Sequence, residues 1–306
     1  MKIAIIGQAA FGKDVLVKLL ENDETVSAAI CPPDNNQSND PMKLAALEHE
    51  IPVYQYNSMR DKSAIKEFAS LGIDLCVMAF VTDIVPREIL TAPTFGTIQY
   101  HPSLLPRHRG PSSINWPIIK GERETGLSIF WPDKGLDTGP ILLQKEVAIT
   151  SEDTLGSLYF GKLFPLGVDA MLEAVQLIKD KKAPRIDQND DDASYEGWCG
   201  TEEAHINWDQ PASDIYNLVR GCDPSPGANT SYQGDRISFF DASYKQTKMP
   251  MHENGTVISV GGNHLGVKVE DGLINIGRVR HGKGPKLSAS EFIEKHGIAE
   301  GSKFPS

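Results

Sequence analysis

The first half of the chain alternates continuous apolar runs with amphipathic segments. Apolar runs of strand length lie at 2–7, 26–31, 51–56, 74–80 and 96–103. Segments with apolar residues at helical spacing lie near 11–21 and at 41–50, 61–72, 86–92 and 112–121. Apolar strands separated by helices indicate a parallel sheet that is covered on both faces.

The pattern changes after residue 125. Two strand-like runs, 126–131 and 140–149, follow each other without a helix, which predicts an antiparallel hairpin at the sheet edge. A long amphipathic pattern over 153–180 predicts a helix that closes the first domain. Residues 181–204 are rich in acidic, polar and turn-forming residues, so we expect a linker that lies over the surface.

From about residue 205 the chain has one helix-like segment, 211–221, and then short β-like runs separated by Gly, Asn and Asp. This spacing is typical of a small barrel or sandwich. The expected fold is therefore α/β, with a Rossmann-like, mostly parallel sheet carrying helices on both faces, followed by a small β-rich, OB-like barrel. We expect an α/β domain over 1–182, a linker over 183–204 and the β-rich domain over 205–306.

Composition narrows the function classes. The 306 residues are 40% hydrophobic and 23% charged, and no apolar run approaches the ~20 residues of a membrane helix, so no membrane partner is expected. The formal net charge of −11 counts against DNA and against general nucleic-acid binding. Four scattered cysteines without metal-ligand spacing, Cys31, Cys76, Cys199 and Cys222, indicate reduced thiols in a cytoplasmic protein. The sequence does not set the oligomeric state.

Ligands of open parallel sheets bind beyond the carboxyl ends of the strands. Chemistry is therefore expected in the turns at 7–13, 31–40, 80–86 and 101–111. The first turn has the P-loop spacing, but Asp14 stands where a Ser or Thr would ligate magnesium. Either Gly7 and Gly12 only permit a tight turn, or backbone N–H groups in this turn face a substrate.

The run GTIQYHPS (96–103) places Gln99 and His101 on one face of a strand and Tyr100 on the other. Pro102 lacks a backbone donor and ends the strand directly after the imidazole. An amide can hold a developing oxyanion, and an imidazole can donate to it or transfer a proton. The alternative is a histidine whose ring is satisfied by a nearby backbone carbonyl.

Two turns rich in glycine and proline follow. SLLPRHRG (103–110) is stiff and presents basic side chains either to an anionic group or to solvent. In PDKGLDTGP (132–140), Asp133 and Asp137 either bond to nearby backbone, as aspartates in turns commonly do, or take part in chemistry. Because glycines bracket Asp137, its carboxylate can be aimed toward His101, where it would accept or relay a proton.

HPSLLPRHRG (101–110), together with GLSIFWPDKGLDTGPILLQKE (126–146), resembles the formyltransferase family that uses 10-formyltetrahydrofolate. This family includes methionyl-tRNA formyltransferase and glycinamide ribonucleotide transformylase. Within this family the chain resembles in particular the N-terminal hydrolase domain of 10-formyltetrahydrofolate dehydrogenase. The similarity extends to about residue 230, and the SLLP and GLDTG turns form a specific pair although either alone is a weak signal.

By this resemblance His101 and Asp137 match the family's catalytic His and Asp, and Gln99 stands at the position of its Asn. The Gln amide is one methylene longer, and a displacement of ~1 Å can cost about a hundredfold in rate. The resemblance implies 10-formyltetrahydrofolate as formyl-donor substrate and no metal. The expected folate-binding residues are Met78, Phe80, Val81, Ser103, Leu104, Pro132, Asp133 and Gly135.

The resemblance leaves two formyl acceptors open. A hydrolase would release formate and tetrahydrofolate, whereas a transferase would formylate an amine on methionyl-tRNA, an amino sugar or a nucleotide. The likeness to the hydrolase domain favours water and the acidic balance counts against tRNA, but the C-terminal domain resembles the tRNA-holding domain of methionyl-tRNA formyltransferase. A non-catalytic folate binder is favoured only by Gln99, and a nucleotide-dependent kinase or oxidoreductase is disfavoured by Asp14.

Overall fold

The computed structural model describes residues 1–34, 39–249 and 251–306. The chain packs as two compact units, each with its own apolar core. Unit 1 contains Met1–Gly110, Gly126–Val147 and Phe160–Tyr195, and unit 2 contains Pro111–Thr125, Ala148–Tyr159 and Glu196–Ser306. Segments 111–125 and 148–159 thus pack with unit 2, although they fall inside the expected first domain. The expected domain bounds stay a prediction.

The sheet of unit 1 has seven strands in the order β3-β2-β1-β4-β5-β6-β7. They are β1 Lys2–Gly7, β2 Thr25–Cys31, β3 Val53–Gln55, β4 Leu75–Ala79, β5 Thr97–His101, β6 Glu124–Phe130 and β7 Ile141–Ala148. Strands β1 to β5 pair in parallel, and β6 runs antiparallel to β5. The predicted, mostly parallel sheet is confirmed, and β6 and β7 form one side of it without a helix between them.

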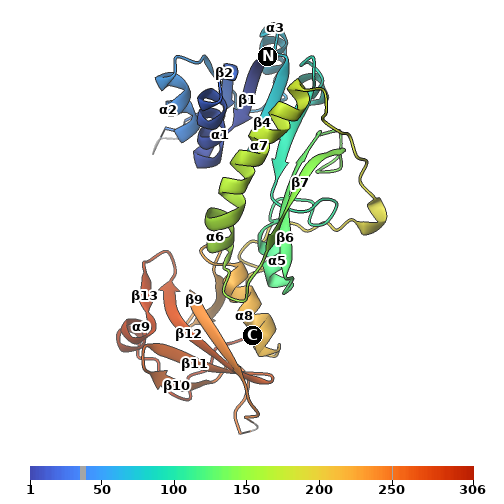
Figure 1. Ribbon diagram of the computed structural model, residues 1–306. Helices are drawn as coiled ribbons and strands as arrows, with labels where there is room; N and C mark the ends of the chain where they lie inside the picture. Colours follow the sequence, from blue (N-terminus) through green and yellow to red (C-terminus); the bar gives the residue numbers. More distant parts are fainter. Residues whose placement is uncertain (35–38, 250) are drawn as a thin grey trace. The chain divides into compact units, whose positions relative to one another are not determined.

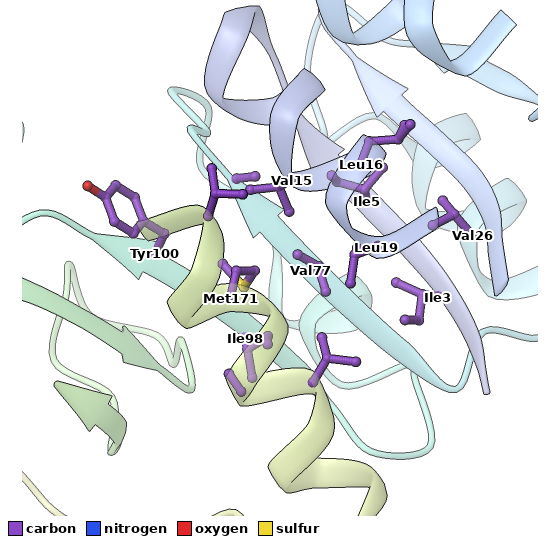
Figure 2. Packing of buried hydrophobic residues seen from close by; sticks show 14 of the residues in the cluster. Ile3, Ile5, Val15, Leu16, Leu19, Val26, Val77, Ile98, Tyr100 and Met171 are labelled. Atoms are coloured by element: carbon purple, nitrogen blue, oxygen red, sulfur yellow. The ribbon is translucent and has the colours of Figure 1, made fainter. Parts of the chain in front are cut away.

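Helices cover both faces of this sheet (Figure 1). Those of unit 1 are α1 Ala9–Glu21, α2 Pro41–Glu48, α3 Lys62–Ser70, α4 Arg87–Leu90, α7 Phe164–Lys179 and the 3-10 turn η2 Asp190–Asp192. On one face, α1 and α7 bury residues three or four apart against alternate residues of the strands (Figure 2). On the other face, α3 and α4 pack against Ala4, Ile6, Cys76 and Met78. This alternation makes β4 apolar throughout and β1 apolar after the exposed Lys2.

The amphipathic pattern over 153–180 folds as three elements rather than as one helix. They are α6 Leu155–Leu158, the π-helix η1 Tyr159–Leu163 and α7. Pro165 lies in the first turn of α7 and has no N–H to donate to the carbonyl four residues earlier. The regular ladder is therefore interrupted at this point, and a wider turn precedes α7.

Unit 2 is built on an antiparallel sheet in the order β10-β11-β12-β9-β8, with β13 paired to β12. Its strands are β8 Ala228–Tyr232, β9 Asp235–Gln246, β10 Val257–Gly261, β11 His264–Val269, β12 Gly272–His281 and β13 Lys286–Ser288. Its helices are α5 Asn115–Ile119, α6, α8 Ala212–Gly221 and α9 Ala289–His296. The core gathers Trp208, Phe239, Phe292 and Phe304. The predicted β-rich domain is confirmed, and its closure into a barrel stays a prediction.

The strand register of unit 1 fixes where a ligand can approach. Gly7 pairs with Ala79, and Met78 pairs with Gln99. The carboxyl ends of β1, β4 and β5 therefore share one edge of the sheet. This is the edge at which open parallel sheets bind ligands.

Candidate active site

Strand β5 presents Gln99 and His101 on one face and Tyr100 on the other. The Tyr100 ring packs in the core against Phe11, with ring centroids 4.3 Å apart. Gln99 is half-buried, and His101 is 5% exposed. The imidazole thus lies at the carboxyl end of β5, enclosed by protein on most sides.

The turn after β5 is closed by side-chain hydrogen bonds. Ser103 Oγ donates to the Arg107 carbonyl at 2.7 Å, and the Leu105 N–H donates to Ser128 Oγ at 3.0 Å. Ser128 Oγ in turn donates to the Ser103 carbonyl at 2.7 Å. His108 has a positive φ of 55°, which turns its peptide back toward the strand. Ser103 is fully buried in this network, and its predicted contact with folate stays a prediction.

The two aspartates of the second turn differ in their surroundings. Asp133 Oδ1 accepts from the Gly135 N–H at 2.9 Å and from Thr138 Oγ1 at 2.7 Å, which are local bonds of an aspartate in a turn. Asp137 is 6% exposed and has a φ of +57°. This left-handed backbone turns its carboxylate inward, away from solvent.

The structure brings the predicted His101 and Asp137 together. His101 Nδ1 lies 3.6 Å from Asp137 Oδ2, and His101 Nε2 lies 2.9 Å from the His108 carbonyl oxygen. A carbonyl only accepts, so Nε2 carries a proton. Nδ1 then faces a carboxylate oxygen, which the Gly110 N–H also holds at 2.9 Å. The Nε2 contact with a backbone carbonyl is the arrangement expected of a structural histidine, whereas Nδ1 faces the Asp137 carboxylate.

Arg109 of the basic turn pairs with an acidic side chain of the same unit. Arg109 Nη2 lies 2.8 Å from Asp190 Oδ1, and the same guanidinium bonds to the Gln188 amide oxygen. Gln188 donates to the Asp137 carbonyl at 2.9 Å. Sequence reasoning missed Gln188 because no local motif separates it from the other polar residues of the expected linker.

The expected folate residues fall into two groups. Met78 is 3% exposed and belongs to the core beneath the sheet edge, and Ser103 is fully buried in the turn after β5. Phe80 is 47% exposed with a φ of +62°, and Val81 is half-buried beside it. The others, which are half-buried or exposed, are Leu104, Pro132, Asp133 and Gly135. The predicted folate contacts of all these residues stay predictions.

A pocket of about 230 Å³ opens beside Phe80 at the carboxyl ends of β1, β2 and β4. Burial, followed by the charge of Asp40, raises the pKa of the Cys31 thiol in its wall to about 11, so this cysteine is no thiolate nucleophile at neutral pH. The strand-end rule anticipated this location, although residues 35–38 of the turn at 31–40 lie outside the described residues. The lining residues are Ile6, Gly7, Gln8, Ile30, Cys31, Pro32, Tyr56, Asn57, Met59, Phe80, Val81, Thr82 and Asp83.

The turn with P-loop spacing holds a carboxylate of the protein itself. The Ala9 N–H donates to Asp40 Oδ2 at 2.7 Å, while Asp40 Oδ1 accepts from the Met42 N–H and caps α2. A Cβ on Gly7 would lie 2.3 Å from the Ala79 carbonyl oxygen, so glycine is required where β1 approaches β4. Both observations favour the tight-turn interpretation, because the carboxylate occupies a donor that a phosphate would use.

Within residues 1–34, 39–249 and 251–306, no cluster of three or more His, Cys, Asp or Glu side chains is placed to ligate a metal. Over the same residues, no helix combines the length and the apolar character needed to cross a membrane.

The sequence and the structure of the chain are similar to those of known proteins. The formyl transferase profile matches residues 1–175, and the formyl transferase C-terminal domain profile matches residues 200–297. Human cytosolic 10-formyltetrahydrofolate dehydrogenase is 42% identical over 283 residues, which are 90% of this chain and 31% of that protein. The chain thus spans about a third of the length of this relative.

Two further comparisons cover proteins of similar architecture. Methionyl-tRNA formyltransferase of Syntrophus aciditrophicus is 33% identical over 308 residues, which are 99% of this chain and 98% of the relative. The crystal structure of HypX from Aquifex aeolicus in complex with tetrahydrofolic acid matches 96% of this chain and 47% of its own, with a TM-score of 0.69 and 19% identity. That likeness shows the shared fold. With both profiles matched in chain order and a relative aligned end to end, the chain belongs to the formyl transferase family.

Proposed function

We propose that this chain binds 10-formyltetrahydrofolate and hydrolyses it to formate and tetrahydrofolate at His101 and Asp137. The buried pair, 3.6 Å apart at the ligand-binding edge of the sheet, is the observation that carries the proposal. The family match and the dehydrogenase relative support the folate, and the sequence resemblance to the hydrolase domain supports water as the acceptor.

The proposed mechanism assigns separate tasks to the two side chains. Water attacks the formyl carbon, and the Asp137 carboxylate accepts a proton from it. His101 Nε2 is engaged with the His108 carbonyl, so Nδ1 is the ring nitrogen that remains to donate a hydrogen bond to the developing oxyanion. The half-buried Gln99 amide is a second donor to that oxygen. When the tetrahedral intermediate collapses, the proton taken up by Asp137 passes to N10, the bond between the formyl carbon and N10 breaks, and formate and tetrahydrofolate leave.

The second candidate is formyl transfer to an amine, in which the amine replaces water. The relative that supports it is the methionyl-tRNA formyltransferase, which aligns with nearly the whole chain. The net charge of −11 counts against a tRNA acceptor.

We place the protein in the cytoplasm, because all four cysteines are free and buried, as in a reducing compartment.

The test is to incubate the purified chain with 10-formyltetrahydrofolate, first alone and then with methionyl-tRNA, an amino sugar nucleotide or glycinamide ribonucleotide. Formate and tetrahydrofolate released in equal amounts without an amine support the hydrolase. A strict requirement for one amine would replace the hydrolase with the transferase. No turnover under any of these conditions would contradict both.

A further inference from the structure

The Gln188 side chain uses its whole amide near the candidate site. Its Nε2 donates to two carbonyl oxygens of the GLDTG turn, those of Asp137 at 2.9 Å and of Gly139 at 2.7 Å. Its Oε1 accepts from Arg109 Nε at 3.2 Å and Nη2 at 2.9 Å. Both amide hydrogens and the amide oxygen are therefore engaged, which fixes the orientation of the amide plane.

Arg109 is itself held on several sides. Its side chain is 10% exposed and pairs with Asp190 at 2.8 Å. Its backbone N–H donates to the Ser194 carbonyl at 3.0 Å, and the preceding His108 N–H donates to Ser194 Oγ at 2.8 Å. Residues 188–194 therefore hold the turn that carries His108 and Arg109 through hydrogen bonds and an ion pair.

These hydrogen bonds connect His101 and Asp137 through the surrounding chain. His101 bonds through Nε2 to the His108 carbonyl, and the neighbouring Arg109 bonds to Gln188. Gln188 then holds the main chain of Asp137, whose carboxylate faces His101. The His101 ring and the Asp137 main chain are thus connected through one set of hydrogen bonds.

We infer that Gln188 is a positioning residue that holds the Asp137 carboxylate against His101. The expected effect on kcat rests on the proposed function. The expected position of the Asp137 carboxylate rests on the geometry alone. Asp137 needs such support because it has a φ of +57° and lies between two glycines, Gly135 and Gly139. A turn of this kind has little preference for one conformation, and a carbonyl left without its donor favours rearrangement.

The kinetic test replaces Gln188 by Ala and by Glu. Loss of the amide lets the carboxylate move by ~1 Å, so kcat should fall about 10- to 100-fold while KM for 10-formyltetrahydrofolate changes about threefold or less. Gln188→Glu should be impaired as strongly, although it still accepts from Arg109, because its carboxylate repels the two carbonyl oxygens.

Gln55→Ala is the matched control. Gln55 also donates to a backbone carbonyl, that of Pro32 at 2.8 Å, and accepts from a cation, Lys43 Nζ at 3.2 Å. This variant should lose a similar amount of thermal stability and keep its kcat. If Gln188→Ala loses stability as Gln55→Ala does and retains its kcat, Gln188 only ties down the chain and the inference is wrong.

A second readout does not depend on turnover. The ring nitrogen resonances of His101 should shift in Gln188→Ala in the same direction as in Asp137→Asn, and should stay unchanged in Gln55→Ala. Unchanged resonances in Gln188→Ala would overturn the inference. Absence of turnover by the wild-type chain would instead overturn the proposed function, so the two failures are distinguishable.

Discussion

At the scale of single residues, the site depends on which nitrogen of His101 is committed to the main chain. Nε2 donates to the His108 carbonyl at 2.9 Å, which leaves Nδ1 for Asp137 and the substrate. Pro102 follows the last residue of β5 and restricts the His101 backbone to an extended conformation. The predicted pair of side chains therefore meets in a defined orientation.

His101→Ala removes the donor assigned to the oxyanion. We expect kcat to fall by a factor of about 10² to 10³, equivalent to about 3–4 kcal/mol of transition-state stabilisation. Steady-state kinetics with 10-formyltetrahydrofolate measures this, with His49→Ala at an exposed position as the control. A variant that loses folding stability and keeps its kcat would show that His101 is a structural residue.

Asp137→Asn removes the proposed proton acceptor with little change in shape. The asparagine still offers an oxygen to the Gly110 N–H and tolerates the positive φ, so the fold should be retained. Turnover should be abolished while the Kd for folate changes about threefold or less, which equilibrium binding and rate measurements on the same preparation can establish. Substantial residual turnover would remove Asp137 from the mechanism, and Asp187→Asn at an exposed position is the control.

At the scale of elements, the GLDTG turn is constrained by the absence of a side chain at Gly139. A Cβ there would lie 1.8 Å from the Trp131 carbonyl oxygen and 2.9 Å from the Trp131 carbonyl carbon. Both contacts are to backbone, which cannot rotate away. The turn that carries Asp137 therefore closes only with glycine at this position.

Gly139→Ala should displace the whole turn. We expect kcat to fall about 100-fold, because Asp137 moves by ~1 Å, and stability to fall by about 1–3 kcal/mol from overpacking. Gly161→Ala is the control, since a Cβ there meets nothing within 4 Å and lies in the helical turn η1. Kinetics and chemical denaturation of both variants test this. Wild-type activity in Gly139→Ala would show that the turn tolerates displacement.

The elements also show how far sequence reasoning extends. The apolar pattern predicted the positions of β1 to β7. Strands such as β1, β4 and β6 are buried on both faces along most of their length and therefore read as continuous apolar runs. The apolar pattern missed the break before α7, because one proline among regularly spaced apolar residues does not change the period. The SLLP and GLDTG motifs identified His101 and Asp137. Gln188 could not be predicted from the sequence, because its role depends on contacts with residues 49 or more positions away.

At the scale of the whole molecule, the two units have separate cores. The apolar clusters of unit 1 and unit 2 share no residue among those described. Unit 1 holds the candidate site, and unit 2 holds the antiparallel sheet with the buried Phe292 of α9. A defect in one core should therefore be felt first in its own unit.

Phe292→Ala should destabilise unit 2 by about 3–5 kcal/mol, because it removes a fully buried ring. Hydrogen exchange followed by mass spectrometry should show faster exchange in β11 and β12 and little change in β1 and β4. Phe95→Ala, at an exposed position, is the control. Equal acceleration in both sheets would show that the two units unfold together.

Water as the formyl acceptor is the central functional claim, and isotope labelling tests it most directly. The wild-type chain is incubated with 10-formyltetrahydrofolate in ¹⁸O-enriched water without any amine, and the formate is analysed by mass spectrometry. The account predicts formate carrying one ¹⁸O atom, formed in step with tetrahydrofolate. No formate in the absence of an amine, or formate without the label, would contradict it.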